Sequence, residues 1–330
     1  MEPLTRGMLS DVWPAPPRPG AEVPLVLERS HAFLDTSDGV LDGLEAEARR
    51  LAALGPPFRR VLEVTRTPVD VSLVWESLVG LTGGDLERGL AAQGRLLPLE
   101  AWLRLALELT AVPPSAPCGP TAGGGTGSLG FDVRRQLVLF PDARLTLFGP
   151  RIDALLPPAP RIGRPDFGAL SPEQVKGLPT VPASRVFAVA GVLAGLLTAA
   201  SPFLRGSLFE TLHAVVRGEL HWDPTENPAC PAALAAVLRR ALLPEPERRW
   251  PDLDAFREAL QGAAGVAPAP LEEVALVALS VDFPRVQAGL RALAAEPAWL
   301  PAAWRAGGLR VLEDSLLESL VPLEQLPPRR

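Results

Sequence analysis

The sequence predicts an α+β protein, in which a small strand-rich unit precedes a larger helical one. Two observations support this prediction. Short runs of β-favouring residues, separated by turns rich in proline and glycine, fill much of the first 79 positions. After residue 80 the apolar residues recur at helical spacing, and the stretch 184–204 is apolar almost throughout.

The first unit is predicted to be a small sheet packed against one helix. Residues 4–29 are typical of strand, turn and strand, and 58–64 and 71–79 of two further strands. Between them, apolar residues at helical spacing predict a helix over 41–54, which the Gly-Pro-Pro at 55–57 ends.

The second unit is predicted to be mainly helical with one hairpin. The two apolar runs QLVLF and ARLTLFG predict the hairpin, because Pro141-Asp142 lies between them. A linker is expected at 262–270 from its Gly, Ala and Pro content, with amphipathic helices after it. The predicted helices are 85–93, 98–111, 184–204, 207–217, 231–243 and 252–261.

Composition excludes several functions. A formal net charge of −6 with mixed signs argues against nucleic acid and against an anionic membrane surface as partners. Two cysteines, Cys118 and Cys230, cannot alone form a structural zinc site, so a reduced cytoplasmic setting is expected, and no signal peptide is apparent. GGGTG at 123–127 lacks the lysine of a phosphate-binding loop, and the three histidines lack metal-ligand spacing.

Five segments, in order, are similar to bacterial Ser/Thr protein kinases. LSPEQVKG at 170–177 resembles the motif that closes a kinase activation segment. The apolar stretch 184–204 and LLPEPERRWPDLDAFREAL at 242–260 follow it as they do in those kinases. EAEARRLAAL at 45–54 resembles the helix of the small lobe, and VWESLVG at 74–80 the hinge.

The resemblance implies a two-lobed protein-kinase-like fold. The expected parts are a β-rich small lobe over 1–79, a helical large lobe over 80–262, and a linker with a helical extension over 263–330. Residues 186–204 are 19 uncharged positions, a length that can span a bilayer. In the kinase fold the same helix is a buried spine of the large lobe, so the resemblance favours burial over a membrane span.

The phosphate-binding parts of the kinase pattern are degenerate. In the place of a loop with three glycines only Gly7 remains, with Thr5 and Ser10 at the outer positions. The position of the strand lysine is Val26, and the chain's single lysine is Lys176. Arg29 is the nearest basic residue in sequence and the candidate to substitute for this lysine.

The helix glutamate that pairs with the strand lysine in kinases matches Glu47. Glu47 either keeps a role in the nucleotide site or is simply a charged residue on a solvent-exposed helix face. An aspartate near the start of the spine helix, which holds the catalytic loop in active relatives, is replaced by Arg185.

The catalytic loop matches LGFDVRRQ at 129–136 in either of two registers. The base aspartate then corresponds to Phe131 or, with one deletion, to Asp132. Gln136 stands where an asparagine would bind the second metal ion, and its longer side chain changes the geometry.

The metal-binding aspartate corresponds to Leu147 or Gly149, neither of which offers a carboxylate to Mg²⁺. A literal Asp-Phe-Gly at 166–168 lies only two residues before the SPEQ motif and is interpreted as a coincidence. No catalytic, cofactor-binding or metal-binding residue is therefore expected. Structural residues are retained, because Glu173 and Arg249 match a buried ion pair of the large lobe.

These matches favour a catalytically inactive kinase homologue, a pseudokinase, that acts as a scaffold or allosteric regulator through contacts with an unidentified protein. The alternatives are an atypical active kinase that uses Arg29 and Asp132, and a module that senses a nucleotide without metal. Trp299 and Trp304 in the C-terminal segment are residue types enriched at interfaces, so this segment either caps the large lobe or binds the partner. The sequence leaves the partner and the oligomeric state open.

Overall fold

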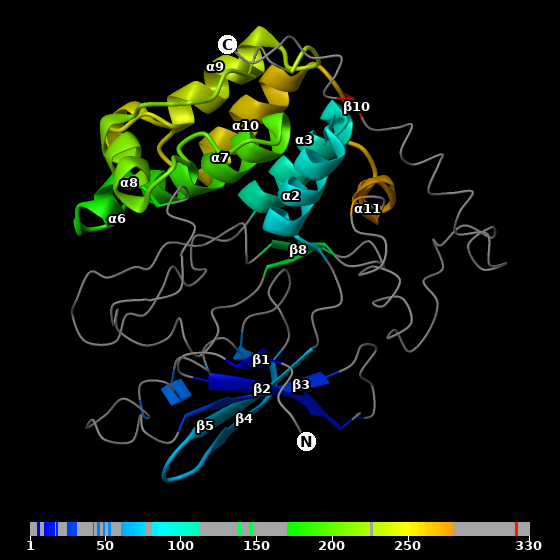
Figure 1. Ribbon diagram of the computed structural model, residues 1–330, viewed down its shortest axis with the longest axis vertical. Helices are drawn as coiled ribbons and strands as arrows, with labels where there is room; N and C mark the ends of the chain where they lie inside the picture. The colour runs from blue at the N-terminus through cyan, green and yellow to red at the C-terminus, as the bar shows by residue number, and fades with distance from the viewer. Residues whose placement is uncertain are drawn as a thin grey trace, which may run out of the picture.

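The computed structural model describes residues 5–6, 10–16, 18, 25–31, 42, 45–46, 49, 52–53, 61–76, 81–111, 137–139, 145–147, 170–224, 227–279, 281 and 321–322. The described strands of the N-terminal part form one sheet, and the described helices of the larger part gather around a separate apolar core (Figure 1).

The N-terminal sheet has five antiparallel strands in the order β1-β2-β3-β5-β4. The β-branched residues in these strands favour an extended backbone, and β5 is buried at five successive positions in the middle of the sheet. The strands predicted at 4–29, 58–64 and 71–79 are present. Their bounds are β1 Thr5–Arg6, β2 Ser10–Ala15, β3 Leu25–Ser30, β4 Val61–Arg66 and β5 Val71–Glu76.

The helix predicted at 41–54 is represented by five helical residues, at 42, 45, 46, 49 and 52. The amide of Ala53 donates to the carbonyl of Arg49 at 3.1 Å, as expected for a helical turn. The guanidinium of Arg49 also contacts the carboxylate of Glu45, one turn earlier, at 2.7 Å.

A second, three-stranded sheet contains the predicted hairpin. Its strand order is β6-β8-β9, and Leu137 lies opposite Leu147. Next to it begin the helices α2 and α3, of which α3 is buried along most of its length. The bounds are β6 Leu81–Thr82, α2 Gly83–Gln93, β7 Arg95–Leu96, α3 Leu99–Thr110, β8 Leu137–Leu139 and β9 Leu145–Leu147.

The helix α7 (Pro182–Thr198) occupies the core of the larger part, and nearly every residue in it is buried. It ends earlier than the predicted 184–204, because Ala199 adopts a left-handed conformation with φ of 52° and Pro202 follows. Among the described residues, no helix combines the length and apolarity needed to cross a membrane.

Neighbouring side chains bind α7 through its backbone carbonyls. The indole nitrogens of Trp102 and Trp222 donate to the carbonyls of Leu193 and Ala194 at 2.8 and 3.0 Å. These bonds satisfy buried polar groups that would otherwise be costly in an apolar core. The remaining helices around α7 are α6 Pro172–Val175, α8 Leu208–Arg217, α9 Ala232–Ala241, the 3-10 helix η4 Pro246–Arg248 and α10 Leu253–Ala264.

The segment expected to be a linker is packed against the large part. Helix α10 crosses the expected boundary at 262 and continues to Ala264. After it, Ala269 is buried, its amide donates to the carbonyl of Glu100 on α3 at 3.0 Å, and its carbonyl accepts from Arg104 at 2.7 Å. The connection is therefore held to α3 at Ala269, while Gly265, Ala267 and Pro270 are exposed.

Two described parts of the C-terminal segment also contact the larger part. Helix α11 (Leu271–Leu279) lies beside α3, with Val274 and Val277 in the same apolar core. Strand β10 (Val321–Pro322) pairs antiparallel with β7. Trp299 and Trp304 lie outside the described residues.

Candidate functional site

The strand β3 carries the position where a phosphate-binding lysine was sought. Val26 lies in this strand opposite Trp75 of β5, and the two side chains are 8% and 1% exposed. A buried valine packed on a buried indole contributes apolar contact to the sheet. It offers no positive charge to a nucleotide.

Arg29, the suggested substitute, lies on the opposite face of the same strand. Successive residues of a strand point to alternate faces, so positions 26 and 29 cannot share one. The pairing agrees, because Arg29 lies opposite Ser72 and its Nε donates to the Ser72 hydroxyl at 3.2 Å. Without a change in register, Arg29 therefore cannot take the place of a lysine at position 26.

The charged residue on the face of Val26 is Glu28, two positions further along β3, and its side chain is 1% exposed. A carboxyl group cannot supply positive charge to nucleotide phosphates. Sequence reasoning passed over this residue, although the period of two from Val26 would have placed it on the same face.

The β8–β9 hairpin carries Leu147, one of the two positions that correspond to the metal-binding aspartate of kinases. Leu147 lies at the end of β9, opposite Leu137 at the start of β8. An alkyl side chain at this position cannot bind a metal ion. The other candidates of the catalytic and metal positions lie outside the described residues: Gly7, Glu47, Phe131, Asp132, Gln136, Gly149 and 166–168.

The candidate at the start of the spine helix, Arg185, is half-buried in the first turn of α7. Ser184 beside it accepts a hydrogen bond from the amide of Val181 at 3.0 Å, which satisfies a backbone donor at the helix start. Across the described part of the chain, no group of three or more His, Cys, Asp or Glu side chains is placed to hold a metal ion.

The structure brings Glu173 and Arg249 together. Two parallel contacts of 2.9 and 3.2 Å join the guanidinium to both carboxylate oxygens, and both side chains are buried. Glu173 belongs to α6, which begins at Pro172, and Arg249 follows η4. The pair therefore connects two segments that are 76 residues apart in sequence.

The guanidinium of Arg249 is satisfied on all sides. It also donates to the carbonyls of Ala183, Leu243 and Pro244, at 3.1, 2.6 and 2.8 Å, and it stacks over the ring of Phe187 at 4.9 Å. Burial lowers the pKa of Arg249, while the contact with Glu173 acts in the opposite direction. This arrangement is structural, since every described donor is used within the protein.

The thiol of Cys230 is a poor nucleophile. Cys230 is a free cysteine, half-buried beside α9, and burial raises the pKa of its thiol to about 11. Only the thiolate is strongly nucleophilic, so this cysteine is unreactive near neutral pH.

Comparison with known proteins agrees with the kinase-like geometry. No protein-family model matches the chain. Tyrosine-protein kinase MasK of Myxococcus xanthus is 34% identical over 92 residues, which are 28% of this chain and 14% of that protein. The kinase domain of Mycobacterium tuberculosis PknI, in a mutant form, matches with a TM-score of 0.54 and 18% identity, over 80% of this chain and 94% of that domain.

The chain therefore has a protein-kinase-like fold, with an N-terminal antiparallel sheet and a helical C-terminal part. Its sequence is similar to a bacterial protein kinase over about a quarter of its length.

Proposed function

We propose that this protein is a catalytically inactive kinase homologue that works through protein–protein contacts, as a scaffold or allosteric regulator. One observation carries the proposal: the face of β3 that would hold the phosphate-binding lysine holds the buried side chains of Val26 and Glu28. Phosphoryl transfer in this fold depends on positive charge and bound metal ions around the phosphates. The described residues at these positions supply neither.

The retention of structural contacts supports the same proposal. The ion pair of Glu173 and Arg249 and the buried helix α7 preserve the large lobe. The fold keeps its packing, while the described positions that would bind phosphate or metal, Val26 and Leu147, are apolar. Such a fold is suited to binding another protein rather than to turning over a substrate.

A phosphotransfer assay together with a thermal-shift experiment tests the proposal. The purified chain is heated with ATP, with and without Mg²⁺, and is incubated with labelled ATP and a general acceptor such as casein. We expect neither a shift in melting temperature nor label transfer, because a nucleotide that does not bind adds no stability.

The names of the similar proteins favour a second candidate, an atypical active kinase, because both are described as kinases. Asp132 would then be the base. Phosphotransfer that is abolished by Asp132→Asn would establish this candidate and overturn the proposal. A thermal shift with ATP in the absence of transfer would instead indicate a nucleotide-sensing module.

A further inference from the structure

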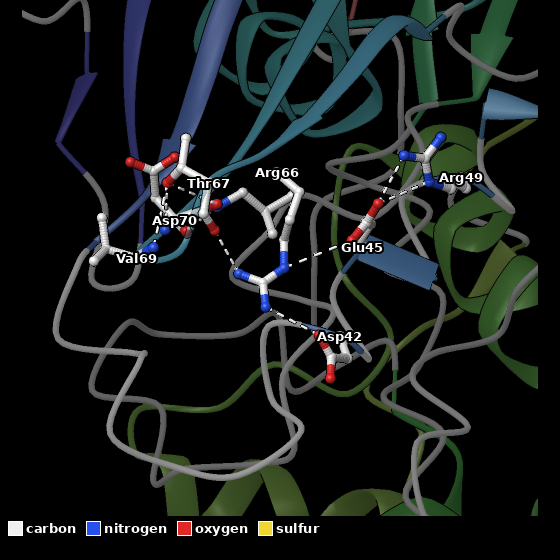
Figure 2. A network of polar contacts seen from close by, with 9 residues as sticks. Asp42, Glu45, Arg49, Arg66, Thr67, Val69 and Asp70 are labelled. Atoms are coloured by element: carbon white, nitrogen blue, oxygen red, sulfur yellow. Dashed lines mark hydrogen bonds and ion pairs between the residues drawn. The ribbon is translucent and has the colours of Figure 1, made fainter.

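Among the described residues, Arg66 joins the helical segment that includes residues 42–53 to the sheet. Arg66 is the last residue of β4, and its side chain is 28% exposed. Its Nη2 contacts the carboxylate of Asp42 at 3.0 Å, and its Nε lies 3.6 Å from that of Glu45 (Figure 2). A single guanidinium therefore contacts two acidic residues that lie three positions apart on the helix.

The guanidinium of Arg66 is also hydrogen-bonded to the turn that follows β4. Its Nη1 donates to the carbonyl of Thr67 at 2.5 Å. The Thr67 hydroxyl accepts from the amides of Val69 and Asp70, at 3.3 and 3.0 Å, and the Thr67 amide donates to the Asp70 carbonyl at 2.9 Å. These bonds close the β4–β5 turn, so the guanidinium projects from a fixed hairpin (Figure 2).

Of the two acidic partners, Glu45 is the one that a second contact positions. Glu45 is 24% exposed, and its second oxygen accepts from Arg49, one turn further along the helix. The carboxylate of Glu45 thus bridges an arginine of the sheet and an arginine of its own helix. Asp42 is 79% exposed, so the contact of Arg66 with Glu45 is the one that is partly withdrawn from water. A carboxylate shared by two arginines in this way binds more strongly than an isolated surface pair.

We propose that Arg66, with Asp42 and Glu45, forms a clamp that positions the small-lobe helix against the sheet. We call this set of three residues the Arg66 clamp. Val26 of β3 has no charge with which to contact an acidic residue of this helix. The contact is made instead by Arg66, at the end of β4. The helix position is then set by the protein itself and does not depend on a bound nucleotide. The independence from nucleotide rests on the proposed function, whereas the contacts of the clamp do not.

Hydrogen exchange of the full-length protein tests the clamp. In Arg66→Ala we expect the amides of 41–54 to exchange about two- to fivefold faster, while those of 71–76 and 182–198 are unchanged. Arg66→Lys should be intermediate, because an ammonium keeps the charge but loses the planar fork. High salt should accelerate exchange of 41–54 in the wild type but not in Arg66→Ala.

Arg18→Ala is the matched control. Arg18 pairs with Glu63 on the same strand β4, at a site of similar partial exposure, and does not belong to the clamp. This variant should leave the exchange of 41–54 unchanged. If Arg66→Ala gives too little folded protein, the double variant Asp42→Asn with Glu45→Gln tests the same contacts from the helix side.

Unchanged exchange of 41–54 in Arg66→Ala would overturn the clamp, as would an equal increase in 71–76 and 182–198. A separate hydrogen-exchange measurement with added ATP tests the nucleotide independence. ATP should leave the exchange of 41–54 unaffected. Protection by ATP would contradict the proposed function, whereas the clamp would still be judged by the response to Arg66→Ala.

Discussion

At the residue scale, the buried pair of Glu173 and Arg249 is the contact whose cost is easiest to anticipate. Removing one partner leaves the other charge buried, which costs more than the pair itself contributes. Both side chains lie below a tenth exposure, and water cannot easily replace the lost partner. This pair therefore ties α6 to the segment that precedes α10.

We predict that Arg249→Ala lowers the free energy of unfolding by about 3–5 kcal/mol. Arg249→Lys should also destabilise the protein, since an ammonium has three donors and cannot reproduce the contacts to Glu173, Ala183, Leu243 and Pro244. Urea denaturation followed by circular dichroism measures both changes.

The neighbouring arginine provides the control. Arg248 pairs with Glu245 at 3.4 Å, and both side chains are largely exposed. Arg248→Ala should change stability by no more than about 0.5 kcal/mol. A small loss in Arg249→Ala, comparable to that of the control, would show that the buried pair contributes little.

At the element scale, the position of α11 depends on a glycine of α2. A β-carbon added to Gly89 would lie 1.9 Å from Cγ1 of Val281, just beyond the end of α11. The side chain of Gln93, one turn further along α2, donates to the Val281 carbonyl at 3.2 Å. Gly89 therefore allows the chain after α11 to approach the α2 backbone closely.

We predict that Gly89→Ala destabilises the protein by about 1–3 kcal/mol, although alanine is the better helix former, because the methyl group forces Val281 away. Combining it with Val281→Ala should recover part of the loss. Thermal denaturation of the two variants measures this effect.

Gly262→Ala on α10 is the corresponding control, because no atom lies within 4 Å of a β-carbon added there. It should be neutral or stabilise the protein by about 0.5–1 kcal/mol through helix propensity alone. If Gly89→Ala behaved in the same way, the close contact with Val281 would not be significant in solution.

At the scale of the whole molecule, the beginning of the C-terminal segment is part of the large lobe. Ala269 bonds to α3, and Val274, Val277 and Val281 belong to the same apolar core as α7. Burying a valine stabilises a protein by about 1.5–3 kcal/mol, so three of them contribute an amount comparable to a typical total stability.

We predict that deletion of 268–330 abolishes folding or yields aggregated protein, as judged by size-exclusion chromatography and circular dichroism. Deletion of 323–330 keeps every contact named above and should leave the melting temperature within a few degrees of the wild type. A deletion of 268–330 that folds normally but no longer binds a partner would assign this segment to the interface instead.

Local pattern predicted most of the described elements. The strands of the N-terminal sheet and the helices α2, α3, α7, α8, α9 and α10 follow from the spacing of apolar residues, which reports the period of each element. The end of α7 at Thr198 was not predicted, because the apolar run was extended past Pro202, a residue that commonly follows a helix end. The bonds of Ala269 to α3 were not predicted, because small residues and prolines occur both in linkers and in connections that contact the core.

The candidate site was predicted only in part. The identity of Val26 was evident from the motif, and so was the expectation that Glu173 would meet Arg249. The suggestion that Arg29 could substitute for the strand lysine neglected the alternation of the strand, which places Arg29 beside Ser72. Arg66 was not singled out, because nothing near it in sequence reveals its acidic partners.

The sequence by itself determined the types of the elements and, through its kinase-like motifs, the class of fold. Both depend on short-range periodicity and on residues that are adjacent in the chain. The tertiary structure decided how α11 docks through Gly89, and which helix residues Arg66 contacts. Periodicity shows that a face is apolar or charged, but the choice of which faces meet is made by packing between segments distant in sequence.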